Sequence, residues 1–141
     1  MVDQSQAVAR TVTGFFQEVG AQIERYSFDE VVIALDLEPR HLNNASTLHG
    51  GVIATLADVA MAMAGTYVEL ASERRVAITL SMSLSFTGIA KAGTRIRAIG
   101  RCRSAGHKIF MSSCEVQDAQ GNLIALGEGV FKRGALRAEL P

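Results

Sequence analysis

One carboxylate stands alone in a long apolar stretch of this sequence. Asp58 is the only charged residue from Gly51 to Val68, and Ala, Leu, Met and Val dominate its surroundings. A carboxylate that is buried without a partner costs several kcal/mol or takes up a proton, so a folded protein keeps one where its charge is used. The pattern therefore predicts a cleft in which Asp58 either attacks a substrate directly or activates water.

A pair of glycines opens the same stretch. The apolar spacing predicts a buried helix over residues 51–70, with Gly50 immediately before it. The first backbone N–H groups of a helix have no partner inside the helix and lie at the positive end of its dipole. Glycine leaves these donors unobstructed, so they are suited to hold a carbonyl oxygen as it becomes an oxyanion. Asn43, Asn44 and His49 make the approach to this helix polar.

The expected helix separates small from bulky residues. At about 100° per residue, one stripe collects Gly51, Ala54, Thr55, Asp58, Ala62 and Gly65, and the opposite stripe collects Ile53, Leu56, Ala60, Met63 and Tyr67. The bulky stripe is typical of core packing. The small stripe, which holds the carboxylate, allows another backbone or a ligand to come close.

Gly51 and Asp58 are too far apart on one helix to act on the same carbonyl group. A rise of about 1.5 Å per residue separates them by about 10.5 Å, whereas a reacting centre needs its oxyanion donor and its nucleophile each at about 3 Å. If both act together, they come from two copies of the helix that lie antiparallel across a two-fold axis. The spacing therefore predicts a homodimer with interfacial sites, and it leaves open whether two such dimers pair into a homotetramer.

The elements around this helix indicate one α+β domain over residues 1–141. Helical spacing predicts an amphipathic helix over residues 4–19 with Asp3 as its N-cap, and alternation predicts a half-buried strand over residues 26–38. Further strands are expected at 76–87, 94–103, 107–118 and 123–132, with a Gly121-Asn122 turn before the last. Short connections favour an antiparallel meander of these four strands, wrapped around the central helix.

Composition restricts the expected partners. The chain has 14 basic and 14 acidic residues and no Trp, so nothing favours nucleic acid or an acidic membrane surface. No apolar run is long enough to span a bilayer and no signal-peptide pattern opens the chain, so we expect a cytoplasmic protein. The three histidines lack metal-type spacing with carboxylates or thiols, and neither a metal nor another cofactor is expected. Cys102 and Cys114 are interpreted as small core residues.

The residues that lead into the helix resemble a known family signature. Residues 43–58, NNASTLHGGVIATLAD, are similar to the N-x-x-G-x-x-H-G-G-x-x-x-x-L-x-D signature of hotdog thioesterases of the phenylacetate-degradation (PaaI-like) type. The similarity extends over about residues 31–132 and includes a G-x-L-I-A-x-G element at 121–127. It implies a hotdog fold, in which an antiparallel sheet wraps around a long central helix, here with an extra N-terminal helix. It also implies a dimer that hydrolyses acyl-CoA or aryl-acyl-CoA thioesters, with the coenzyme as part of the substrate.

The resemblance suggests roles for individual residues of the site. Asp58 matches the family's catalytic acid, and Gly51 with its neighbour Gly50 matches the backbone donors to the thioester carbonyl. Thr79 falls where the family often has a Ser or Thr that holds the hydrolytic water. Strict alternation groups Thr79 with the serines of its strand, so the sequence leaves open which face of the strand it occupies.

The loop before the helix matches the family in part. Asn43 matches the family's Asn, which helps to orient the thioester or water, with Asn44 as an alternative. His49 either shapes the helix entrance and contacts the thioester or only caps the helix. Ser46 stands where the family motif usually has Gly, so the sequence leaves open which of the two asparagines is the functional one.

The phosphates of the coenzyme require cations for binding, and two other functions of a hotdog protein also fit the sequence. Arg103, Lys108 and Lys132 flank expected turns and are the candidates for phosphate binding. One alternative function is a hotdog module that binds acyl-CoA without turning it over. Another is a hotdog dehydratase or hydratase, which would use a His and acid pair on unsaturated acyl chains.

Overall fold

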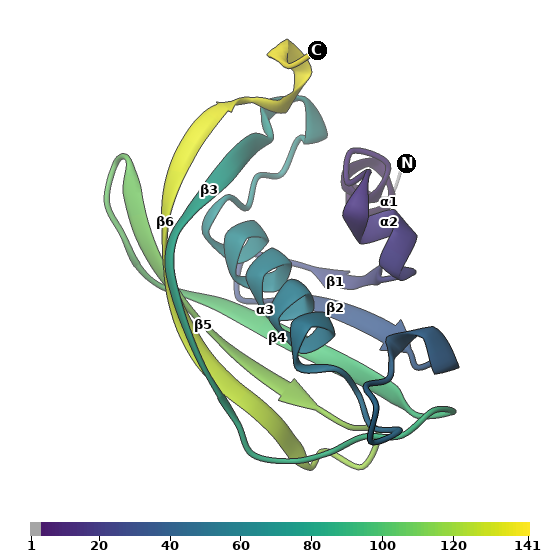
Figure 1. Cartoon of the computed structure of the whole chain (residues 1–141). Coiled ribbons are helices and arrows are strands. Elements are labelled where there is room, and N and C mark those ends of the chain that lie inside the picture. The colour runs from purple at the N-terminus through teal and green to yellow at the C-terminus, as the bar shows by residue number, and fades with distance from the viewer. Residues whose placement is uncertain (1–3) are drawn as a thin grey trace.

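The computed structural model describes residues 4–141, in which a curved six-stranded antiparallel sheet wraps around the long helix α3 (Figure 1). The strands lie in the order β1-β2-β4-β5-β6-β3. They are β1 Gln22–Tyr26, β2 Val31–Asp36, β3 Arg75–Phe86, β4 Arg95–Ala105, β5 Ile109–Gln117 and β6 Leu123–Leu136. The helices are α1 Gln4–Ala9, α2 Phe15–Val19 and α3 Gly50–Gly65, with 3-10 turns η1 Pro39–His41, η2 Ala71–Glu73 and η3 Arg137–Glu139. The predicted α+β hotdog architecture is confirmed.

Helix α3 is buried along its bulky stripe. Ile53, Leu56, Ala60 and Met63 are all buried, as predicted, and most of the small stripe is half-buried or exposed. Gly65 is the exception, because the ring of Phe110 fills the space where its side chain would be. The helix ends at Gly65 instead of continuing to residue 70, so Tyr67 lies beyond its C-terminus.

The four later strands do not all follow each other in the sheet. Strands β4, β5 and β6 form the predicted meander, but β3 pairs with β6 and β4 pairs with β2. The connection over residues 87–94 carries the chain across the sheet, and the N–H groups of Thr87 and Gly88 bind the carbonyl of Ile124 at 2.8 and 3.0 Å. The prediction of a four-strand meander was therefore wrong, and β3 lies at a free edge of the sheet.

Strand β2 is shorter than predicted and is buried on both faces. Its first five residues are all buried, although a half-buried strand was expected. Ion pairs made by arginines of β4 contribute to the cover on its outer face. Arg97 of β4 binds Glu24 of β1 with a 2.6 Å contact, and Arg101 of β4 binds Glu30 at 2.9 Å. These long side chains shield the outward Val32 and Ala34 from water.

The N-terminal region is less regular than the predicted helix over residues 4–19. Helices α1 and α2 are separated by a β-branched run, Thr11 to Thr13, and by Gly14, which has a φ of 71°. β-branched residues disfavour a helix, and a positive φ cannot occur inside one. Asp3, the predicted N-cap, lies outside the described residues. Strand β1, which the sequence analysis missed, pairs with β2 as an edge strand.

Candidate active site

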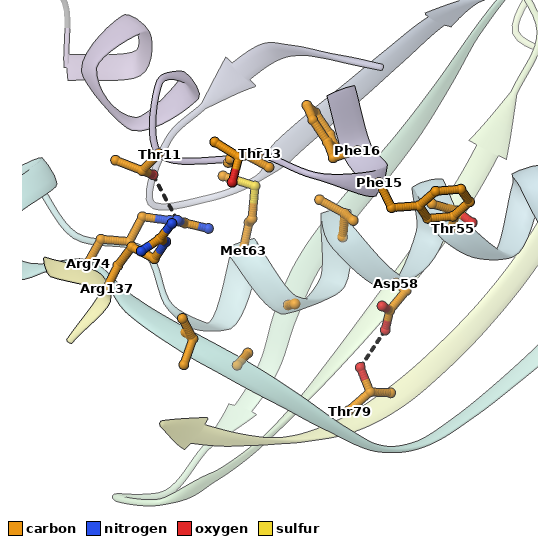
Figure 2. Close-up of a pocket in the computed structure, with 15 residues that line it drawn as sticks. Thr11, Thr13, Phe15, Phe16, Thr55, Asp58, Met63, Arg74, Thr79 and Arg137 are labelled. Atoms are coloured by element: carbon orange, nitrogen blue, oxygen red, sulfur yellow. Dashed lines mark hydrogen bonds between the residues drawn. The ribbon is translucent and has the colours of Figure 1, made fainter. Parts of the chain in front are cut away.

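Asp58 is half-buried on the small stripe of α3 and accepts a hydrogen bond from a threonine of β3. The Thr79 hydroxyl donates to Asp58 Oδ1 with an Oγ1–Oδ1 distance of 2.6 Å (Figure 2). A β-bulge between Thr79 and Ser81 makes this contact possible, because it shifts the inward face of β3 by one residue. Thr79 pairs with the buried Phe131 and faces α3, whereas Ser81 beyond the bulge faces outward. The bulge thus decides the face that alternation left open.

The start of α3 presents two glycine amides, and one of them donates a hydrogen bond to a histidine ring. His49 is the N-cap residue, and its Nδ1 accepts the N–H of Gly51 at 2.8 Å. The N–H of Gly50, one residue earlier, makes no hydrogen bond within residues 4–141. Of the two donors, the Gly50 amide is therefore the one that an incoming carbonyl oxygen can reach without displacing His49.

Asn43 organises the loop that leads to this helix. Its side-chain oxygen accepts the N–H of Ala45 at 2.9 Å, and both the N–H and the hydroxyl of Thr47 at 3.2 Å. Asn44 is exposed and makes no side-chain hydrogen bond among the described residues. Ser46 has a φ of 60°, and it is the one non-glycine residue of this chain's described part with a positive φ. The left-handed conformation explains why glycine suits this position of the motif.

A cavity of about 580 Å³ opens beside Asp58. The N-terminal segment Thr11–Phe16 forms one wall, α3 forms the floor and the first half of β3 forms the opposite wall (Figure 2). Apolar side chains line its middle, namely Val12, Phe16, Val59, Ala62, Met63, Val76 and Ala77. The segment after α1 and the start of α2 therefore help to enclose a pocket next to the carboxylate.

Two arginines lie at the end of this cavity away from Asp58 (Figure 2). Arg74 Nη1 donates to Thr11 Oγ1 at 2.7 Å, which ties the N-terminal segment to the start of β3. Burial lowers the pKa of Arg74; Tyr26 partly opposes this effect and the nearby Arg137 adds to it. The sequence analysis missed both arginines, because only the pairing of β3 with β6 brings them together.

The three candidate residues for phosphate binding do not all line the same cavity. Lys108 and Lys132 line a second cavity, of about 250 Å³, together with Arg75, His107 and Arg133. Arg103 lines a different hollow, where its Nε donates to Ser113 Oγ at 2.7 Å. The structure thus brings Lys108 and Lys132 together and leaves Arg103 apart from them.

Other polar groups of the chain are structural. Within residues 4–141, no three His, Cys, Asp or Glu side chains form a possible metal cluster. His41 is buried between Glu38 and Val19, bound to the backbone of both. Cys114 is buried, and this burial raises the pKa of its thiol to about 12. Cys102 is half-buried against the core.

No described helix is both long and apolar enough to cross a membrane.

Comparisons with known proteins agree with this fold. The model of the thioesterase superfamily matches residues 45–125, which include Asp58 and Thr79. The chain belongs to the thioesterase superfamily. As a member of that superfamily it is a thioester hydrolase in its general chemistry. Human acyl-coenzyme A thioesterase 13 is 31% identical over 100 residues, which cover 70% of this chain and 69% of the human protein.

Solved structures extend the comparison. A single-residue variant of the phenylacetic acid degradation protein PaaI from Thermus thermophilus is 27% identical, with a TM-score of 0.74 over 84% of this thioesterase and 97% of that chain. Thioesterase superfamily member 2 of zebra fish is 25% identical, with a TM-score of 0.79 over 92% of this chain and 95% of that one. The expected likeness to PaaI-type hotdog proteins is confirmed.

Proposed function

We propose that this chain hydrolyses acyl-CoA thioesters to a free acid and CoA, with Asp58 as the group that attacks the carbonyl or activates water. The observation that carries the proposal is the hydrogen bond from Thr79 to Asp58 at one end of a cavity with many apolar lining residues. The bond fixes the orientation of the carboxylate, and the cavity provides space for an acyl chain. The similarity to human acyl-coenzyme A thioesterase 13 supports CoA as the leaving group.

The thioester carbonyl is held by the start of α3 in a second copy of the chain. Gly50 and Asp58 are eight residues apart, which corresponds to about 12 Å along one helix, so one small carbonyl group cannot reach both. The Gly50 amide donates to the carbonyl oxygen, and the Gly51 amide joins it when the His49 ring turns away. Asn43 holds the loop in front of this donor, so its role in the site is to order the approach.

The free edge of β3 supports a homodimer. Its backbone groups on the side away from β6 have no strand partner among the described residues, and Ile78 and Leu80 on this strand are more than half exposed. An unpaired edge with apolar side chains is a template for strand pairing. Two copies joined at β3 would lie antiparallel and complete each other's sites, and no further pairing of dimers is needed for this.

The phosphates of CoA bind at the cationic cavity of Lys108 and Lys132. Five basic or titratable residues line this cavity, and none of its lysines forms an ion pair within residues 4–141. Clustered cations bind phosphate oxygens by charge-assisted hydrogen bonds. Arg103 faces a neighbouring hollow and stays a weaker candidate for the same role.

A thiol-release assay tests the proposal with short, medium, long and aryl acyl-CoAs. We expect the Asp58→Asn variant to lose about a hundred- to ten-thousand-fold in kcat, because general-base catalysis supplies an acceleration of that order. Its affinity for acyl-CoA should remain. Asp36→Asn, at the exposed end of β2, is the matched control and should keep full activity.

Two outcomes would point to the alternative functions. Binding of acyl-CoA by the unaltered chain without any thiol release would favour the binding module. Hydration of an unsaturated acyl-CoA with the thioester left intact would favour the hydratase. Near-normal hydrolysis by Asp58→Asn would remove this residue from the mechanism.

A further inference from the structure

The cavity beside Asp58 has a cationic far end. Arg74 lies between η2 and β3, Arg137 follows β6, and both line the cavity that Asp58 and Thr79 line at its other end (Figure 2). The backbone N–H of Arg137 donates to the carbonyl of Arg74 at 2.7 Å. The paired ends of β3 and β6 therefore hold the two arginines next to each other.

No described carboxylate balances these two charges. The ion pairs within residues 4–141 involve other arginines, namely Arg25, Arg40, Arg95, Arg97 and Arg101. The Arg74 guanidinium has a neutral partner in Thr11, and the Arg137 side chain makes no hydrogen bond in the described part of the chain. Two neighbouring cations that are partly withdrawn from water repel each other, and an anion placed between them relieves the repulsion.

The cavity is shaped so that one ligand can contact both of its ends. The reactive carboxylate lies at one end, apolar residues such as Val59 and Met63 line the middle, and the guanidinium groups lie at the other end. The extended backbone from Arg74 to Thr79 spans roughly 16 Å, and arginine side chains that reach back along the cavity shorten this distance. An acyl chain of several methylene groups fits between the reacting carbonyl and the cations.

We propose that Arg74 and Arg137 bind an anionic group at the end of the acyl chain remote from the thioester, so that the preferred substrates are CoA half-thioesters of dicarboxylic acids. The terminal carboxylate accepts N–H groups from Arg137 and from the part of Arg74 that Thr11 leaves free. The inference rests on the proposed function, since it names the substrate class of the same site. A phosphate of the coenzyme offers similar chemistry, and the experiment must separate these two sources of the anion.

The test compares ligands that differ only in the terminal group. Dissociation constants of the Asp58→Asn variant are measured for adipyl-CoA and hexanoyl-CoA. Values of kcat/KM for the unaltered chain are measured with succinyl, glutaryl, adipyl and suberyl thioesters and with the matching monocarboxylic thioesters. Each series is prepared both on CoA and on N-acetylcysteamine, which has no phosphate. Arg137→Gln is the test variant because the Arg137 side chain makes no hydrogen bond or ion pair with another described residue. Arg10→Gln is its control, because Arg10 is exposed.

We expect adipyl-CoA to bind roughly ten- to a hundred-fold more tightly than hexanoyl-CoA, the gain typical of a hydrogen bond to a charged group. Arg137→Gln should abolish this preference on both carriers and leave hexanoyl-CoA unchanged, and Arg10→Gln should keep the preference. Equal affinities for the two acyl groups would overturn the proposal. So would a variant that weakens every CoA thioester equally and spares the N-acetylcysteamine series, because the anion would then be a phosphate.

The affinity measurements keep this inference separate from the proposed function. If the unaltered chain hydrolyses no thioester, the proposed function fails, and the affinities of Asp58→Asn still decide the role of the arginines. If it hydrolyses hexanoyl-CoA and adipyl-CoA equally well and binds them equally, the proposed function stands and the substrate preference is wrong.

Discussion

The contact between Thr79 and Asp58 gives the carboxylate a fixed orientation. The hydroxyl donates its proton to Oδ1, which leaves the lone pairs of Thr79 Oγ1 available to accept a hydrogen bond from water. A water molecule bound there would lie next to the carboxylate that is to activate it. Thr79 is thus a positioning residue in the proposed mechanism, and it acts through its hydroxyl group.

Replacing Thr79 by valine removes the hydroxyl and keeps the shape of a β-branched strand residue. We expect kcat to fall roughly ten- to a hundred-fold, because a hydrogen bond to a charged group is worth about 1.5–3 kcal/mol, with KM changed little. Thr79→Ser keeps the hydroxyl and should restore most of the activity. Steady-state kinetics of both variants provide the check, and equal losses in valine and serine variants would show that only packing at this position matters.

At the scale of elements, the turn before α3 carries a local strain. Ser46 adopts a φ of 60°, is exposed, and its side chain makes no hydrogen bond among the described residues. A residue with a Cβ atom loses about 1–2 kcal/mol in the left-handed region. The Asn43 side chain holds the turn in place despite this cost.

Ser46→Gly should therefore stabilise the protein. Relief of the left-handed strain exceeds the extra backbone entropy that glycine brings to the unfolded chain, about 0.5–1 kcal/mol, so we expect a net gain of roughly 0.5–1 kcal/mol. Urea unfolding measures this as a higher midpoint at an unchanged slope. Ser46→Ala retains the Cβ atom and should show no such gain; an equal gain in both variants would contradict the explanation by strain.

The elements differ in how far the sequence determined them. The periodicity around Asp58 predicted α3 and its buried stripe, because a long helix shows its apolar face in many residues. Strand β1 gave no such signal, since it is a short edge strand with mostly exposed side chains. The side on which Thr79 lies depends on a β-bulge, and the meeting of Arg74 with Arg137 depends on which strand pairs with β6. Neither the bulge nor the strand pairing can be recognised from the spacing of apolar residues along the sequence.

At the scale of the whole molecule, the proposed site draws on distant parts of one helix. The free Gly50 amide and the Asp58 carboxylate lie at positions that only a second copy of α3 can bring to the same carbonyl. The free edge of β3 lies next to Asp58 through Thr79, so pairing at this edge would place the two helices close to each other. The proposed mechanism therefore requires a dimer.

Mixing two inactive variants tests this division directly. Asp58→Asn lacks the carboxylate, and Gly50→Pro lacks the amide donor at the first helical position, where proline is well tolerated. The backbone of His49, with φ −67° and ψ 131°, already has the conformation favoured before proline. Unfolding and refolding an equal mixture should produce mixed dimers as half of the population, each with one intact site of two. We therefore expect about a quarter of the unaltered activity from the mixture, and almost none from either variant alone. A mixture that stays inactive while native mass spectrometry shows mixed dimers would place both groups of each site in a single subunit.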